Sequence, residues 1–187
     1  SALEVETQGQ LEDYRVLYTG VGKVNATLEL TKVLQKAHLH YLPPMPKLVI
    51  NYGTAGSRKI KKKQLVDCTK FIQRDMDVTG LGFMKGETPF ELDPPLIIES
   101  TSEFNPIGRK ASCGSGDSFV EDRTNYYGEV VDMEAYALAK VCYHYDIPFI
   151  SFKYITDGAD EQSHEDWEKN LANGIVEFKE RILEKIE

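Results

Sequence analysis

The sequence predicts one α/β domain with a largely parallel or mixed sheet. Short apolar runs, rich in β-branched and aromatic residues, alternate along the chain with stretches of helical periodicity. Glycine-rich turns follow several of the runs, which is typical of strand ends. The length of 187 residues fits a single domain over residues 1–187 with a sizeable core.

The first half of the chain predicts three strands and one helix. Residues 14–18 predict a strand that ends at Gly20 and Gly22, and a helical period follows over residues 24–37. Residues 47–51 and 65–72 predict the next two strands. Only a few residues precede the first turn, so we expect the opening strand of the sheet to be shortened or absent.

The second half predicts four further strands, over residues 96–99, 109–113, 129–132 and 148–155, and a helix over 133–145. From residue 163 onward apolar residues recur every three or four positions, which predicts one long amphipathic helix packed on the sheet. The long segment 75–95 is rich in glycine and proline. We expect it to be an active-site or interface loop.

The composition excludes several classes of partner. The net charge of −8 disfavours nucleic acid and anionic membranes. No apolar run approaches the roughly 20 residues of a membrane span, and the start of the chain lacks signal-peptide features, so we expect a soluble, cytoplasmic protein. The three separated cysteines and four histidines show no metal-ligand spacing, and we expect no metal or cofactor.

The common phosphate and hydrolase motifs fail on spacing. A P-loop around Gly22-Lys23 would need a glycine and a hydroxyl residue where Leu17 and Val24 stand. Dinucleotide fingerprints that start at Gly20 or Gly114 lack their third glycine. A GxSxG nucleophile elbow is absent.

What remains is a set of carboxylates near strand ends: Asp117, Asp132, Glu134 and Asp157. Each one alone reads as a helix cap or a surface charge, but ligands of open α/β sheets bind at strand ends. Asp157 closes an apolar run, so we expect its carboxyl group to be partly desolvated. Such a group can hold a proton near neutral pH and act as an acid.

Several motifs carry a resemblance that spans nearly the whole chain. Val130-Val131-Asp132-Met133-Glu134-Ala135 and Ile155-Thr156-Asp157-Gly158-Ala159-Asp160 are similar to the signature of the 5′-methylthioadenosine/S-adenosylhomocysteine nucleosidases, within the purine nucleoside phosphorylase superfamily. Asn51-Tyr52-Gly53-Thr54 and Ser115-Gly116-Asp117-Ser118-Phe119 resemble it in the same order. The resemblance implies a nucleoside phosphorylase-like, three-layer α/β/α domain with a central twisted mixed sheet.

The resemblance also implies roles for individual residues. Asp157 would protonate N7 of a departing purine, and Glu134 would bind the ribose hydroxyls. Glu6, in a segment similar to Gly-Ala-Met-Glu-Glu-Glu, would activate water, although it also reads as a surface residue. The remaining substrate-binding candidates around base and sugar are Phe119, Val120, Met133 and Thr54. Cleavage of an N-glycosidic bond needs such an acid at the base and anionic groups near the sugar.

The 5′ side of the substrate pocket should be apolar, and Leu3, Trp167, Leu81 and Phe83 are the candidates. Trp167 reads equally well as a core residue of the last helix. In the family the loop that holds Leu81 and Phe83 reaches a neighbouring subunit, which implies a homodimer.

The sequence leaves three reaction classes open: a nucleosidase, a phosphorylase and a non-catalytic nucleoside-binding protein. Phosphorylases of this superfamily place an arginine where Asn51 stands, and a neutral amide cannot hold a phosphate dianion. Hydrolysis is therefore favoured. The preferred 5′ substituent, whether methylthio, homocysteinyl, deoxyadenosyl or futalosine-like, stays open.

Overall fold

The computed structural model describes residues 1–40, 44–122 and 126–186. Its elements, in chain order, are α1 (Glu4–Thr7), α2 (Lys23–His40), β1 (Val49–Gly56), β2 (Leu65–Gln73), η1 (Thr79–Leu81), β3 (Ile98–Glu99), β4 (Ala111–Ser115), β5 (Val130–Asp132), α3 (Ala135–His144), β6 (Phe149–Asp157), α4 (Ser163–Asn170), α5 (Gly174–Arg181) and η2 (Leu183–Lys185). None of the helices in this part of the chain is both long and apolar enough to cross a bilayer.

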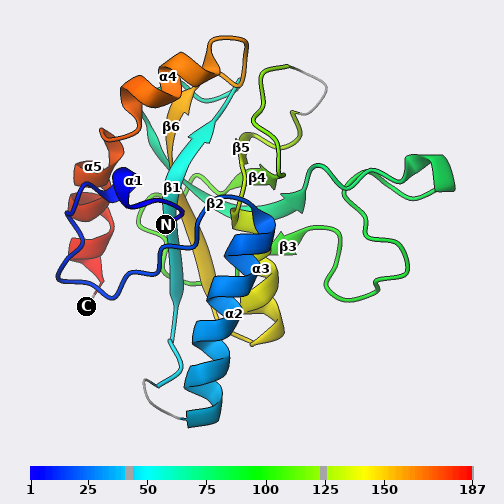
Figure 1. Cartoon of the computed structure of the whole chain (residues 1–187), viewed down its shortest axis with the longest axis horizontal. Helices are drawn as coiled ribbons and strands as arrows, with labels where there is room; N and C mark the ends of the chain where they lie inside the picture. The colour runs from blue at the N-terminus through cyan, green and yellow to red at the C-terminus, as the bar shows by residue number, and fades with distance from the viewer. Residues whose placement is uncertain (41–43, 123–125, 187) are drawn as a thin grey trace.

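The strands form one mixed sheet in the order β3-β2-β4-β5-β1-β6 (Figure 1). The pairs β1–β6, β2–β4 and β4–β5 are parallel, whereas β2 runs antiparallel to β3. The first half of β2, residues 65–68, also pairs antiparallel with β6. The sheet therefore closes on itself, because β2 pairs with both β4 and β6. The predicted mixed sheet is confirmed.

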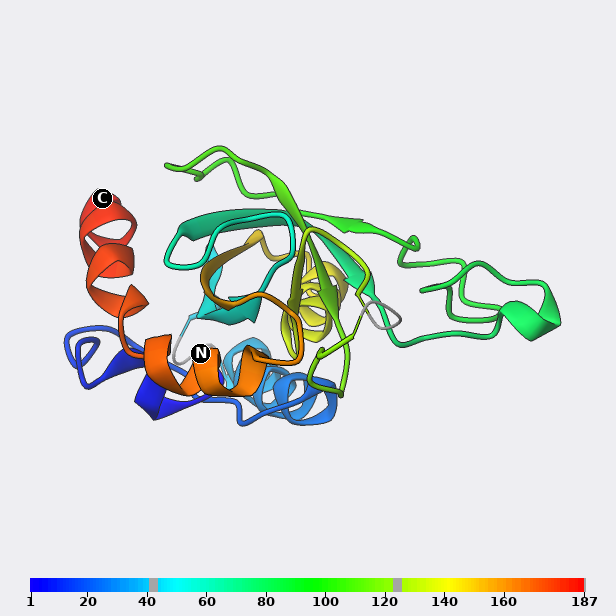
Figure 2. The same cartoon turned by 90° about the horizontal axis from the view of Figure 1, so that it is seen from above.

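Apolar side chains alternate between the two faces of β6, and helices cover both faces (Figure 2). Phe149 and Ile155 pack into a core that α2 and α3 complete. Ile150 and Phe152 point to the opposite face, where they pack against Phe178 of α5. This alternation is the period-2 pattern of a strand buried on both sides. The layered α/β/α arrangement expected from the resemblance is the one observed.

The predicted strand over residues 14–18 is wrong. This segment forms no sheet ladder. The Leu17 carbonyl accepts a hydrogen bond from the Ser1 amino group (3.3 Å), and just after the segment the Thr19 amide donates to the Ser1 carbonyl (3.1 Å). Beside it, β1 and β5 share only the register pair Gly56–Val131. A cavity of about 370 Å³ lies next to β1, between the sheet, α2 and α5.

The single long helix predicted from residue 163 onward is also wrong, because the segment forms two helices, α4 and α5, and the short η2. Gly174 opens α5 directly over the Tyr154 ring of β6. A Cβ atom at position 174 would lie 2.3 Å from Cγ of Tyr154. The apolar periodicity does mark buried positions, since Ile175, Phe178 and Ile182 are all buried. It continues across the break between α4 and α5, so it does not reveal where the helix ends.

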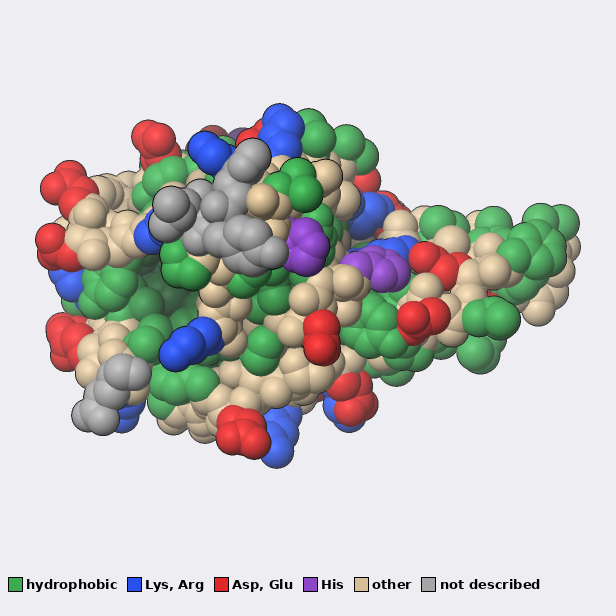
Figure 3. Space-filling model, turned by 90° about the horizontal axis from the view of Figure 1, so that it is seen from below, with side chains coloured by type: hydrophobic (Ala, Val, Ile, Leu, Met, Phe, Trp, Pro, Cys, Tyr) green, Lys and Arg blue, Asp and Glu red, His purple; other side chains and the backbone are tan. Residues whose placement is uncertain are grey.

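The predicted functional loop projects away from the body of the protein as an arm between β2 and β3 (Figure 1). We call residues 75–97 the arm. Its large apolar side chains are exposed to unusual degrees, Leu81 at 77%, Met84 at 61%, Phe90 at 91% and Leu92 at 96%. Figure 3 shows hydrophobic side chains gathered on this projection. An apolar surface of this kind is typical of interaction sites.

The contact between Gly174 and Tyr154 yields a stability test. Gly174→Ala should destabilise the protein by about 1–3 kcal/mol, because the added methyl group cannot fit without displacing α5 or the Tyr154 ring. Gly80→Ala is the matched control, because a Cβ atom there meets nothing within 4 Å. The control should stay within about 0.5 kcal/mol of the wild type in urea unfolding. Equal effects of both changes would contradict the packing described for α5.

Candidate active site

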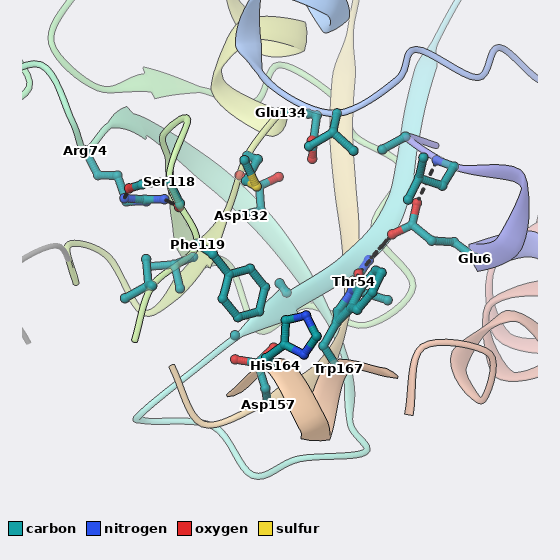
Figure 4. A pocket seen from close by; sticks show the side chains of 18 residues that line it. Glu6, Thr54, Arg74, Ser118, Phe119, Asp132, Glu134, Asp157, His164 and Trp167 are labelled. Carbon is teal, nitrogen blue, oxygen red and sulfur yellow. Dashed lines mark hydrogen bonds between the residues drawn. The ribbon is translucent and has the colours of Figure 1, made fainter. Parts of the chain in front are cut away.

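A cavity of about 330 Å³ lies where β1, β5 and β6 end (Figure 4). Its walls come from segments that are distant in the sequence. They place six candidate residues around one space: Glu6, Thr54, Phe119, Glu134, Asp157 and Trp167. Gly56 permits this convergence. A Cβ atom there would lie 2.5 Å from Oδ1 of Asp157, so the strand could not pass so close to the carboxylate with any other residue.

Glu6 is buried at the base of α1, with 4% of its surface exposed. Its Oε1 accepts hydrogen bonds from the amide and the hydroxyl group of Thr54, both at 2.9 Å. Its Oε2 accepts hydrogen bonds from the Leu3 amide at 3.1 Å and from the Ser1 hydroxyl at 2.8 Å. These four donors fix the plane of the carboxylate at the edge of the cavity. The reading of Glu6 as a surface residue is wrong.

Asp132 and Lys153 form a buried ion pair next to the cavity, with 2.7 Å between Nζ and Oδ2. Burial acts to raise the pKa of Asp132, but the charge of Lys153 and hydrogen bonds from Ser115 and the Ala135 amide outweigh it and lower that pKa. Burial likewise acts against the charge of Lys153, and Asp132 reverses that effect and raises the lysine pKa. Both groups are therefore ionised at neutral pH.

Glu134 stands beside this pair in a different state. Its Oε1 accepts a hydrogen bond from the Gly22 amide at 2.9 Å. Burial, followed by the negative charge of Asp132, raises the pKa of Glu134 to about 7, although Lys153 and the Gly22 hydrogen bond oppose the change. Glu134 therefore exchanges a proton in the physiological range.

Asp157 lies at the end of β6 with 3% of its surface exposed. Burial raises the pKa of its carboxyl group above the ordinary value, although the Ala159 amide (3.0 Å) and the Thr156 hydroxyl (2.9 Å) donate to it. The carboxyl group predicted to be partly desolvated is thus almost wholly buried, and its proton affinity is raised as that prediction requires.

The loop that carries Phe119 and Val120 forms the opposite wall. The Arg74 guanidinium holds this loop by donating to the Gly116 carbonyl at 3.2 Å and to the carbonyl and hydroxyl groups of Ser118. Phe119 stays 42% exposed at the cavity, and its ring lies edge-on to His164 with 6.4 Å between the ring centres. A flat ligand ring could pack against this exposed aromatic face.

The structure brings most of the predicted site residues together. The cavity is lined by Leu3, Glu6, Thr54, Phe119, Val120, Met133, Glu134, Asp157 and Trp167. Leu81 and Phe83 do not line it: both lie on the arm, where Phe83 packs edge-on against Phe90 with 5.5 Å between the ring centres. Asn51 is also outside it, and its side-chain carbonyl accepts a hydrogen bond from Ser151.

Sequence reasoning missed His164, Arg74 and Val21 as lining residues. His164 follows shortly after the motif that contains Asp157, so its position in the sequence was a usable signal. Arg74 directly follows a predicted strand, and a lone arginine at a strand end gives no comparable signal. In the described part of the chain, no three His, Cys, Asp or Glu side chains gather as a metal site would require.

Residues 6–186 match the family model of the phosphorylase superfamily. The chain belongs to this superfamily. The match covers all of the cavity-lining residues except Ala2 and Leu3.

Solved structures show the same fold. A futalosine hydrolase mutant from Helicobacter pylori superposes with a TM-score of 0.80 at 20% identity, over 99% of this chain and 96% of that one. A putative 5′-methylthioadenosine/S-adenosylhomocysteine nucleosidase from Francisella philomiragia gives 0.79 at 18% identity, with the same coverage. A Helicobacter pylori MTAN mutant with 5′-methylthioadenosine in its active site gives 0.75 at 22% identity, over 90% of this chain and 79% of that one.

The raised pKa of Glu134 predicts how stability depends on pH. A carboxyl group binds its proton more tightly in the folded state when its folded pKa lies above its unfolded value, so folding loses stability as pH rises from about 4.5 to about 7. The loss at pH 8 should be about 3 kcal/mol. Glu134→Gln should remove it, because the amide is never charged. Urea unfolding at pH 4 and pH 8 measures this effect, and an identical pH dependence in both proteins would contradict it.

Proposed function

We propose that this protein is an N-glycosyl hydrolase that releases adenine from nucleosides with a 5′ thioether, such as 5′-methylthioadenosine or S-adenosylhomocysteine. One observation carries the proposal: three buried carboxyl groups, on Glu6, Glu134 and Asp157, surround a single cavity. Their environments differ, and such differences in environment assign different acid and base roles to carboxyl groups within one site.

The proposed reaction uses each group once. Asp157 donates its proton to N7 of the purine as the bond between N9 and C1′ breaks and its electrons pass to the base. Glu134 binds the ribose hydroxyl groups, and its charge stabilises the cationic sugar. Glu6 accepts a proton from a water molecule whose oxygen forms the new bond to C1′. Phe119 packs on the base.

Charge in the cavity favours water over phosphate as the nucleophile. The negative charge of Glu6 would repel a phosphate dianion, and the charge of the nearby Lys153 is already neutralised by Asp132. Arg74 is directed to the Gly116 and Ser118 carbonyls on the other side of the cavity. Asn51 adds no charge. Phosphorolysis is therefore the weaker alternative.

The choice of substrate rests on the cavity wall beside Glu6. Leu3 and Trp167 give it an apolar surface that suits a thioether. The structural neighbours are named for 5′-methylthioadenosine, S-adenosylhomocysteine and futalosine, so a futalosine-like arm is the second candidate. A panel of these nucleosides, compared by kcat/KM, ranks them.

Release of adenine from 5′-methylthioadenosine in phosphate-free buffer tests the proposed function. We expect turnover by the wild type, and kcat lower by about 10² or more in Asp157→Asn, because the amide keeps the shape but cannot donate the proton. Binding of the nucleoside should survive better than turnover. A wild type that binds nucleosides without cleaving them would indicate a binding protein, and near-native kcat in the variant would refute the role of Asp157.

We propose further that the protein is a homodimer and that the arm forms part of its interface. Four large apolar side chains on the arm, Leu81, Met84, Phe90 and Leu92, have no partner surface within the described chain that would bury them. The arm is held to α3 by an ion pair between Glu91 and Lys140 and by a hydrogen bond between Tyr143 and Asp93. A tethered apolar projection suits docking against a second copy, where Leu81 and Phe83 would reach the partner's cavity.

Sedimentation of the wild type should show a dimer, and Leu92→Ser should weaken it by about tenfold or more, as loss of a buried apolar anchor does. Val176→Ser is the matched control, because Val176 is 52% exposed on α5, which lies on the opposite side of the molecule from the arm (Figure 1). A fully active monomeric wild type, or equal effects of the two changes, would refute the interface.

A further inference from the structure

A single hydroxyl group joins the indole of Trp167 to the carboxylate of Glu6. The Nε1 atom of Trp167 lies 3.0 Å from Oγ1 of Thr54, and that oxygen lies 2.9 Å from Oε1 of Glu6. The three residues come from α4, β1 and α1, so no local sequence constraint brings them together (Figure 4).

The chemistry of the groups fixes the direction of both hydrogen bonds. An indole N–H can only donate, and an ionised carboxylate can only accept. The Thr54 hydroxyl must therefore accept from Trp167 and point its own hydrogen at Glu6. Without the indole, this hydroxyl could rotate and bond elsewhere. Trp167 thus orients the Thr54 hydroxyl group so that its hydrogen atom points at Glu6.

This contact is distinct from the other supports of Glu6. The Leu3 amide and the Ser1 hydroxyl hold Oε2 from the segment that contains Glu6 itself. Thr54 holds Oε1 from the sheet, through its amide and its hydroxyl. Trp167 supports Glu6 indirectly and through its side chain, which is also part of the apolar wall, so it links the surface facing a substrate arm to the carboxylate.

We propose that Trp167 is a positioning residue for Glu6, acting through the Thr54 hydroxyl, in addition to forming part of the cavity wall. The proposal rests on the function proposed above for its effect on turnover, but the hydrogen-bond chain itself can be measured without any substrate. It predicts that losing the indole N–H impairs turnover, whereas losing apolar wall surface impairs binding.

Trp167→Phe separates the two roles, because it keeps an aromatic wall and removes only the donor. We expect kcat to fall about 3- to 10-fold with KM within about twofold, the usual effect of one lost hydrogen bond on an oriented group. Leu3→Ala, which removes wall surface alone, should instead raise KM.

Thr54→Val supplies a second, independent test, since valine keeps the branched shape without the hydroxyl. It should lower kcat at least as much as Trp167→Phe, and the double variant should be no worse than Thr54→Val alone, because both changes break one chain. Thr27→Val is the matched control: Thr27 is exposed on α2, where its hydroxyl donates to the Lys23 carbonyl, and kcat should not change.

A spectroscopic test needs no activity. The protein has one tryptophan, so nitrogen-15 labelling gives one indole N–H signal. Glu6→Gln should shift this signal in the wild-type background and leave it unmoved in the Thr54→Val background. Thr54→Val should also speed its exchange with solvent.

The two measurements separate the inference from the function on which it rests. The positioning role would be overturned by an indole signal that does not change in Thr54→Val. It would also be overturned if the wild type is active and Trp167→Phe keeps the wild-type kcat. Coupling of the indole signal to Glu6 in a protein that cleaves no nucleoside would support the positioning of Glu6 and refute the nucleosidase.

Discussion

The buried ion pair between Lys153 and Asp132 is the interaction on which the site depends. Both side chains are only 1% exposed, and each would be an uncompensated buried charge without the other, at a cost of about 3–5 kcal/mol. The pair ties the end of β5 to β6, and β6 also carries Asp157. The charge of Lys153 also acts on Glu134, where it opposes the rise in pKa. One cation thereby reduces the mutual repulsion of the carboxylates around it.

The same pair divides the carboxyl groups by proton affinity. Asp132 contacts Lys153 directly and has a lowered pKa, whereas burial, followed by the charge of Asp132, raises the pKa of Glu134. Asp157 lies farther along β6, and burial raises its pKa without a cation among the main causes. Acid and anion therefore coexist in one small cavity. Glycosidic cleavage requires this combination, because the base gains a proton while the sugar becomes cationic.

Local sequence patterns predicted the strands correctly where a segment consists mainly of apolar residues. The apolar runs before Gly56, Asp132 and Asp157 are strands, and their ends converge on the cavity. The parallel neighbours β1 and β6 place their carboxyl ends at one edge, and the end of β5 meets the end of β1 at the pair Gly56–Val131. The two wrong elements involve tertiary contacts that periodicity does not record. Residues 14–18 lack a ladder partner, and the final helical pattern breaks where Gly174 meets Tyr154.

The motif resemblance located most of the lining residues, but it could not predict the hydrogen bonds between them. Nothing in the sequence around Trp167 indicates that its indole donates to Thr54, which is 113 positions away. The Arg74 contacts with the Phe119 loop are equally non-local. Leu81 and Phe83 were predicted near the 5′ side of the pocket, but a single chain places them on the arm, so that role depends on a second subunit.

The origin of the new oxygen on the sugar tests the central claim, that water held by Glu6 is the nucleophile. The reaction is run in water enriched in oxygen-18, with inorganic phosphate present, and the sugar is reduced at once so that its C1 oxygen cannot exchange. Incorporation of one solvent oxygen at C1 in the wild type, and loss of product in Glu6→Gln, is the expected result. A ribose 1-phosphate product with no solvent oxygen would show that phosphate attacks, and it would contradict the role assigned to Glu6.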